Sequence, residues 1–181
     1  VCDYRRGLDT VPNPASGAIS RGWLNDREVL RGAVALAAVG AVPGLWLIWK
    51  TGWVLFWIAA AGALLGTVYS AGPRPLKQYA LGDAAVFFAF GVLGSLGAWT
   101  VQTGRAAWLP AIWAVPFSLQ VSAVLHANNW RDRTGDLSQG VRTVSGRLGP
   151  AGSSHYYRAL IVLSFVLHAA LIPAVPLADG G

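Results

Sequence analysis

The sequence predicts an all-α fold, a bundle of helices that crosses a membrane several times. Of its 181 residues, 54% are hydrophobic and only 12% are charged, whereas a typical soluble domain is about 25% charged. Five stretches contain no Asp, Glu, Lys or Arg, and each is about long enough for a helix to cross a bilayer: residues 32–49, 51–73, 84–104, 106–130 and 159–178. A soluble helical core is the alternative, but five such stretches leave too little polar surface for it.

The first two spans follow a polar lead-in at residues 1–28. Asn25, followed three residues later by Glu28, predicts a capping box, in which each side chain accepts a hydrogen bond from the other residue's backbone. The first two spans are joined only by the short turn at residues 50–52, which predicts an antiparallel pair of helices. Gly and Pro inside the spans do not argue against helices, because both are common in transmembrane segments.

The later spans are joined by segments whose composition ends helices. Residues 70–83, SAGPRPLKQYALGD, form a loop rich in Pro and Gly, and residues 103–107 form a tight turn. Residues 128–150 form the largest loop, which we expect to begin as a helical extension of the fourth span. The last span lies within residues 155–176. The chain is therefore predicted to hold about five spans and no soluble domain.

The distribution of basic residues orients these spans. The net charge is +6 and the isoelectric point about 10.1, which taken alone would favour nucleic-acid binding. However, Lys50 and Arg105 lie on one side of the predicted membrane, and the other 12 of the 14 basic residues lie on the opposite side. This positive-inside bias predicts a lipid bilayer as the partner, no nucleic acid, and cytoplasmic segments at residues 1–28, 70–83 and 128–150.

The most informative stretch is HANNWRDRTGDLSQGVRT, which begins at His126. Within it, Asn128, Asp132 and Asp136 recur every four residues, so on a helix they would share one face. Two carboxylates at that spacing repel each other, and at the end of a span they also resist desolvation. A bound cation explains this pattern better than plain charged residues at the membrane surface do. Hard oxygen ligands suit Mg²⁺, particularly when a phosphorylated substrate completes its coordination.

A second acidic segment, CDYRRGLDT, opens the chain and contains Asp3 and Asp9. Gly7 lies between them and is expected to break a helix there, so that both carboxylates turn inward. Four spans separate the two acidic segments, so both face the cytoplasm, and we expect Asp3, Asp132 and Asp136 to converge on one cavity. Two Mg²⁺ ions held there would clamp a diphosphate and neutralise the charge that develops as it leaves.

Further side chains near these segments are candidates to bind a substrate. Three basic residues are expected to contact the remaining phosphate oxygens: Lys77, Arg74 and Arg131. Tyr69 and Asp83 flank the loop at residues 70–83 and are expected at the mouth of the pocket. His126 is a candidate to orient a ligand or transfer a proton, and a histidine with a purely structural role at the membrane surface is its alternative.

These motifs resemble those of the UbiA superfamily of membrane prenyltransferases. NNWRDRTGDLSQGVRT resembles the second Asp-rich motif of the family, and CDYRRGLDT resembles the second half of its first motif. YSAGPRPLKQYALGD, residues 69–83, resembles the central loop of the menaquinone branch, which contains 1,4-dihydroxy-2-naphthoate polyprenyltransferases and related vitamin K2-forming enzymes of animals. The resemblance covers essentially the whole chain.

The resemblance implies Mg²⁺-dependent transfer of a polyprenyl group from a polyprenyl diphosphate to an aromatic acceptor. The favoured acceptor is 1,4-dihydroxy-2-naphthoate, which would lose CO₂ as diphosphate is released. Carried over by position, five residues match metal ligands of the family: Asp3, Asp9, Asn128, Asp132 and Asp136. Of these, Asp3, Asp132 and Asp136 also match its catalytic residues. The substrate-binding candidates, some from the resemblance and some from the residues alone, are Lys77, Arg131, Asn129, Arg74, Tyr69 and His126.

The resemblance also implies an organisation and a location. Residues 1–181 would be one membrane prenyltransferase domain, truncated at both ends, with its active site on the cytoplasmic side of a bacterial inner membrane. Another aromatic acceptor such as 4-hydroxybenzoate is the near alternative. A transporter is a more distant one, but it would place a charge or a broken helix near the middle of the membrane. A membrane scaffold without chemistry would not need the register of Asn128, Asp132 and Asp136.

Overall fold

The computed structural model describes residues 1–8, 10, 17–72 and 75–174. These residues contain helices and connecting segments and no strand, which confirms the predicted all-α fold. The chain divides into two compact units, Val1–Trp53 and Val54–Gly181, and each unit is described by itself.

The first unit holds a short helix, α1 (Cys2–Arg5), and a long one, α2 (Asp26–Thr51). Gly7 adopts a φ of +77°, which favours glycine, and α1 ends before it, as predicted. The capping box is also confirmed, because Asn25 Oδ1 accepts from the Glu28 backbone at 2.9 Å and Glu28 Oε2 accepts from the Asn25 backbone at 2.7 Å. An ion pair of 2.8 Å between Arg5 and Asp26 ties α1 to the start of α2.

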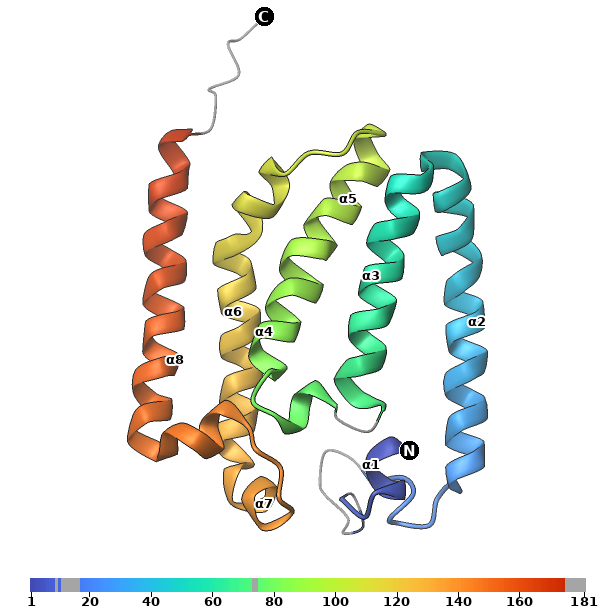
Figure 1. Cartoon of the computed structure of the whole chain (residues 1–181), viewed down its shortest axis with the longest axis vertical. Coiled ribbons are helices and arrows are strands. Elements are labelled where there is room, and N and C mark those ends of the chain that lie inside the picture. The colour runs from blue at the N-terminus through green and yellow to red at the C-terminus, as the bar shows by residue number, and fades with distance from the viewer. Residues whose placement is uncertain (9, 11–16, 73–74, 175–181) are drawn as a thin grey trace, which may run out of the picture. The chain divides into compact units, whose positions relative to one another are not determined.

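The second unit contains the rest of the helices. In chain order they are α3 (Trp53–Ser70, whose first residue belongs to the first unit), η1 (Leu76–Gln78), α4 (Gly82–Val86), η2 (Phe87–Leu93), α5 (Gly94–Thr103), α6 (Leu109–Arg131), α7 (Arg133–Ser138), α8 (Val144–Leu171) and η3 (Ile172–Ala174). The segments α4, η2 and α5 follow one another without a break and form one spanning helix (Figure 1). Within it, η2 is wound as a π-helix.

Four helices among the described residues are long and apolar enough to cross a membrane: Asp26–Thr51, Trp53–Ser70, Gly82–Thr103 and Leu109–Arg131. They correspond to the first four uncharged stretches of the sequence. The fifth stretch begins in α8 and ends outside the described residues. The predicted multi-span architecture is therefore confirmed for the part of the chain that the structure describes.

In the second unit, α6 occupies the centre. It packs against α8 on one side and against α4, η2 and α5 on the other (Figure 1). The residues buried in these contacts are small, including Ala85, Ala123 and Ser164, while large apolar residues such as Phe117 and Phe165 are more than half exposed. Small residues between helices and large ones facing outward are typical of membrane proteins, because lipid rather than water surrounds the bundle.

Two spans approach each other closely where η2 crosses α6. A Cβ atom added to Gly91 would lie 1.6 Å from Ser118 Oγ and 2.4 Å from its Cβ. Ser118 is fully buried and its hydroxyl donates to the Ala114 carbonyl at 2.7 Å, so it has little room to move. The contact therefore requires glycine at position 91.

We expect Gly91→Ala to destabilise the protein by about 1–3 kcal/mol, the usual range for a side chain forced into a filled interior. The measurement is the melting temperature of the purified protein in detergent. Gly97→Ala is the matched control, because a Cβ there would lie at an ordinary 3.6 Å from Ile58 Cγ2. Equal melting temperatures for the two variants would contradict the close packing of η2 on α6.

The last long helix is bent near its start. Thr143 Oγ1 caps α8 by accepting from the Gly146 backbone at 3.1 Å. Gly149 then adopts a φ of +70°, directly before Pro150, so that the regular helix is interrupted there. Ser153 bridges the bend, with its Oγ 3.2 Å from Ser145 Oγ. The bend leads from α7 into the long apolar part of α8 that packs on α6 (Figure 1).

Candidate functional site

The candidate residues of the second unit gather where α3 ends, α4 begins and α6 ends. Gly82, the first residue of α4, shows how close these parts are. A Cβ atom placed on it would lie 3.5 Å from Leu125 Cδ2, 3.8 Å from the Tyr69 ring and 3.9 Å from Lys77 Cα. The candidates Tyr69 and Lys77 therefore lie next to the same turn of helix, which meets α6 at Leu125, about two helical turns before α6 ends at Arg131.

The Lys77 loop, residues 75–81, is also held by the segment that follows Asp136. The Arg142 backbone N–H donates to the Gln78 carbonyl at 3.2 Å, and the Arg147 guanidinium donates to the Tyr79 carbonyl at 3.4 Å. These contacts confirm that the loop at residues 70–83 and the segment at residues 128–150 lie on the same side of the bundle, as the charge distribution predicts.

The acidic segment that contains Asn128, Asp132 and Asp136 continues α6 with one interruption. Helix α6 ends at Arg131, and Asp132 adopts φ −88° and ψ 2° before α7 begins. The backbone hydrogen bonds from Asp132 to Asn128 and from Asp136 to Asp132, each 3.0 Å, nevertheless keep the i to i+4 spacing. Asn128 is exposed, whereas Asn129, Asp132 and Asp136 are partly buried. The expected helical extension is present, but it bends at Asp132.

Arg131 holds the carboxylate of Asp132 in a bidentate pair. Its Nε lies 2.8 Å from Asp132 Oδ1 and its Nη2 lies 2.7 Å from Oδ2. This hydrogen bonding, more than any other cause, lowers the pKa of Asp132 below its ordinary value. The pKa of Asp136 is raised, first by burial and then by the negative charge of Asp132. The two carboxylates therefore lie close enough to repel each other.

The donor set fits a divalent cation that also binds phosphate oxygens. No group of three or more His, Cys, Asp or Glu side chains among the described residues could hold a metal by itself. Mg²⁺, however, is often held by only one or two carboxylates together with the phosphates of a substrate. Asp132 and Asp136 provide such a pair, and a cation would offset the negative charge of Asp132, which adds to the effect of burial in raising the pKa of Asp136. Because Arg131 occupies both oxygens of Asp132, a cation there would share or displace that ion pair.

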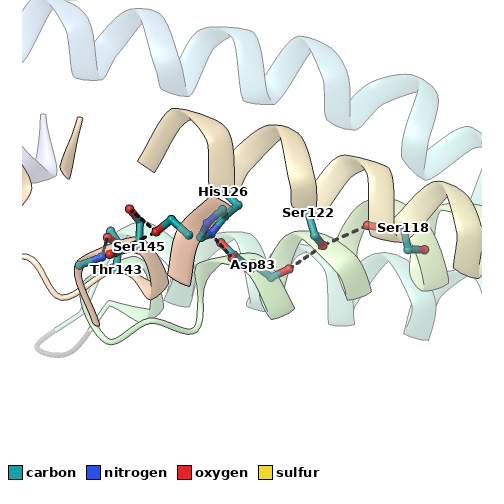
Figure 2. A network of polar contacts seen from close by, with 8 residues as sticks. Asp83, Ser118, Ser122, His126, Thr143 and Ser145 are labelled. Carbon is teal, nitrogen blue, oxygen red and sulfur yellow. Dashed lines mark hydrogen bonds and ion pairs between the residues drawn. The ribbon is translucent and has the colours of Figure 1, made fainter. Parts of the chain in front are cut away.

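A buried polar network lies between α4, α6 and α8 (Figure 2). Asp83 Oδ2 and His126 Nδ1 are 3.2 Å apart, and their side chains are 5% and 0% exposed. The Ser122 hydroxyl lies 3.0 Å from the carbonyl oxygens of both Asp83 and Ser118. The rings of Tyr156 and His126 pack in a T-shaped contact, with ring centroids 4.7 Å apart. Two further buried atoms of the pair, Asp83 Oδ1 and His126 Nε2, make no hydrogen bond.

This network differs from the expectation for its two central residues. Asp83 was expected at the mouth of a pocket, but it lies in the interior of the bundle. His126, a candidate to orient a ligand, points at Asp83 instead (Figure 2). The sequence shows an acid at the start of one uncharged stretch and a histidine near the end of the next. Nothing in the sequence pairs them, because they are 43 residues apart.

The remaining candidates are distributed as follows. Asp3 is partly buried in α1 of the first unit, so its convergence with Asp132 and Asp136 stays a prediction. Asp9 and Arg74 lie outside the described residues. Tyr69 lines a cavity of about 370 Å³ between α3 and the start of the next span, whose other walls are apolar: Leu65, Gly66, Ala85, Val86, Ala89 and Phe90.

The chain is similar to known proteins over most of its length. The model of the UbiA prenyltransferase family matches residues 3–181. UbiA prenyltransferase domain-containing protein 1 of Rattus norvegicus is 30% identical over 183 residues, which are 97% of this chain and 54% of that protein. The human protein of the same name is 30% identical over 171 residues, 93% of this chain and 50% of its own length.

A bacterial enzyme also matches. The 1,4-dihydroxy-2-naphthoate octaprenyltransferase of Bacillus subtilis is 25% identical over 165 residues, 91% of this chain and 53% of that protein. The chain thus spans about half the length of the curated relatives it matches. No solved structure matches it significantly.

Proposed function

Because the chain belongs to the UbiA prenyltransferase family, we propose that the full-length protein transfers a polyprenyl group from a polyprenyl diphosphate to an aromatic acceptor. The family match over residues 3–181 carries this proposal. The structure supports it by bringing a lysine loop and an acidic segment together at one end of a bundle of membrane-spanning helices.

In this proposal the Lys77 loop and the acidic segment both contribute residues that bind the diphosphate. Lys77 and Arg131 contact its oxygens, since cationic side chains form strong charge-assisted hydrogen bonds with phosphate. Asp132 and Asp136, with Asn128 and Asp3, hold divalent cations, for which we propose Mg²⁺. A bound cation would supply neutralisation of the charge that develops on the leaving diphosphate. The apolar cavity beside Tyr69 provides a surface on which a prenyl chain can lie.

We assign 1,4-dihydroxy-2-naphthoate as the acceptor. The support is the similarity to the octaprenyltransferase of Bacillus subtilis and the NNWRD sequence that begins at Asn128. The electron-rich ring would attack the first carbon of the prenyl chain as the bond to diphosphate breaks. The ring carbon that forms the new bond then loses its carboxylate as CO₂, and the released electron pair restores the aromatic ring. A 4-hydroxybenzoate acceptor would instead lose a ring proton.

A direct competition tests this acceptor. With one prenyl diphosphate and both acceptors at equal concentration, we expect the full-length protein to prenylate dihydroxynaphthoate at least about tenfold faster, a difference of roughly 1.4 kcal/mol between the two transition states. The products are separated by mass, and CO₂ release is counted separately. Faster prenylation of 4-hydroxybenzoate without CO₂ would refute the acceptor and leave the reaction class intact. Absence of both products would count against the prenyltransferase proposal itself.

The spanning helices and the family identify an integral membrane protein. We further propose that residues 1–181 act as one prenyltransferase domain, that its membrane is a bacterial inner membrane, and that the site faces the cytoplasm. The excess of basic residues around Lys77 and Arg131 supports this orientation. Labelling of single cysteines by a reagent that does not cross membranes tests it, since a cysteine at position 79 should react only from the cytoplasmic side.

A further inference from the structure

The buried pair of Asp83 and His126 is a costly feature of the bundle. Both side chains lie inside the unit, and one polar atom of each makes no hydrogen bond. Polar and ionisable groups in the interior of a membrane protein are expensive, and apolar residues of similar size often replace such a pair without loss of stability. Stability alone therefore does not account for the pair. The best-attested benefit of a buried polar pair is that it fixes one register between elements.

The two partners join the segments that carry the proposed site. Asp83 is the second residue of α4 and directly follows Gly82, which packs against Tyr69 and the backbone of Lys77. His126 lies near the end of α6, two residues before Asn128 and six before Asp132. A shift of α4 along α6 would therefore move the Lys77 loop relative to the acidic segment. The contact of 3.2 Å between the two side chains opposes such a shift.

Other contacts surround the pair on both sides. Ser122 holds the Asp83 carbonyl (Figure 2), and the ring of Tyr156 in α8 packs on His126 in a T-shaped contact. On its far side the Lys77 loop is tied to Arg142 and Arg147. The loop is thus anchored at its end by α6 and α8 and along its length by the segment after Asp136.

We propose that Asp83 and His126 are positioning residues, which set the Lys77 loop against the Asn128–Asp136 segment and do not themselves contact the substrate. This inference rests on the proposed function, because it assigns the pair a task in diphosphate binding. His126 then acts through Asp83, and Asp83 acts through the backbone that leads to Lys77.

Hydrogen exchange tests the anchoring without any substrate. In the full-length protein in lipid nanodiscs, His126→Ala should speed amide exchange in residues 76–82 about tenfold, because the loop opens locally more often. His126→Asn should restore slow exchange, since its amide nitrogen takes nearly the position of Nδ1 and can still donate to Asp83. Ser164→Ala is the matched control. It removes a partly buried hydrogen bond of 2.9 Å that Gln120 of α6 donates to the fully buried Ser164 of α8, and it should leave the exchange of residues 76–82 unchanged.

Kinetics then separates positioning from chemistry. His126→Ala should raise KM for the prenyl diphosphate about tenfold, a loss of roughly 1.4 kcal/mol of binding, while His126→Asn and Ser164→Ala stay near the unchanged protein. If His126→Ala does not fold, Asp83→Asn takes its place, with about threefold faster exchange expected because the hydrogen bond remains and the charge is lost.

Two results would overturn the proposal. One is exchange in residues 76–82 that does not differ between His126→Ala, or its substitute Asp83→Asn, and Ser164→Ala. The other is a His126→Asn protein with slow exchange but a lost kcat and an altered pH profile, which would make His126 an acid or base in the reaction. Absence of prenyl transfer in every variant and in the unchanged protein would count against the proposed function, and the exchange comparison would still decide the anchoring.

Discussion

Replacing Asp132 by alanine is expected to lower prenyl transfer by the full-length protein on the order of a thousandfold, the upper range for removing one stabilising contact to a leaving group. Asp132 is kept ionised by the bidentate contact with Arg131. Its negative charge adds to the effect of burial in raising the pKa of Asp136. Without it, the cation that neutralises the departing diphosphate loses a ligand. The loss should therefore appear in kcat as well as in KM, measured with a saturating acceptor.

Two further variants test whether the lower turnover of Asp132→Ala comes from the loss of a metal ligand. Ser138 ends the short helix α7 that follows Asp132, and its hydroxyl donates to the Gly135 carbonyl at 2.7 Å. The Ser138→Ala variant should retain near-normal turnover. Arg131→Ala removes the ion pair but leaves the carboxylate, so it should weaken diphosphate binding with less effect on kcat. Near-normal turnover of Asp132→Ala would refute the assignment of Asp132 as a ligand. Equal losses of kcat in Asp132→Ala and Arg131→Ala would indicate that the ion pair itself, and not metal binding, matters.

Removal of divalent cations is the second change for which we expect a very large effect. Turnover in excess EDTA should fall at least about a hundredfold, because a diphosphate placed beside Asp132 and Asp136 would meet two negative charges with no cation between them. Added Mg²⁺ should restore it. Calorimetry gives an independent readout, since pyrophosphate should bind with Mg²⁺ present and should bind at least about tenfold more weakly without it.

An inert cation controls for ionic strength in this experiment. Sodium chloride at matched ionic strength should not restore activity, because screening by salt does not replace a coordinated ion. Full turnover in excess EDTA would contradict the metal assignment. Pyrophosphate binding that is equally strong with and without Mg²⁺ would show that basic side chains such as Lys77 are sufficient to hold it.

The parts of the fold that the sequence predicts depend on local rules. Long uncharged stretches identify the spans, Asn25 and Glu28 identify a helix start, and Gly7 identifies a helix end. Charge counts also place the loop at residues 70–83 on the same side as residues 128–150, which the contact between Arg142 and Gln78 confirms. Each of these features is decided by neighbouring residues or by the membrane, both of which are visible in a single sequence.

The features that the sequence does not reveal arise from contacts between distant residues. The bend of α6 at Asp132 accompanies an ion pair that uniform helical spacing would not indicate. Helix α8 begins at Val144, within the predicted loop, because it consists of two helical stretches that meet at a kink at Gly149. The pairing of Asp83 with His126 depends on how two spans pack. Of the candidate site, the sequence identifies the residues of the acidic segment and of the Lys77 loop, but not what holds them together.

The π-helical segment η2 has a consequence for how this span can change length during evolution. A π turn contains one residue more than the α-helical turn it replaces. Loss of one residue within Phe87–Leu93 can thus be absorbed by rewinding to an α-helix, with both flanking faces kept near their original directions. The same loss in α4 would rotate the residues before it by about 100° and turn Asp83 away from His126. Loss of a single residue is therefore better tolerated in η2 than in α4, provided that a glycine still meets Ser118.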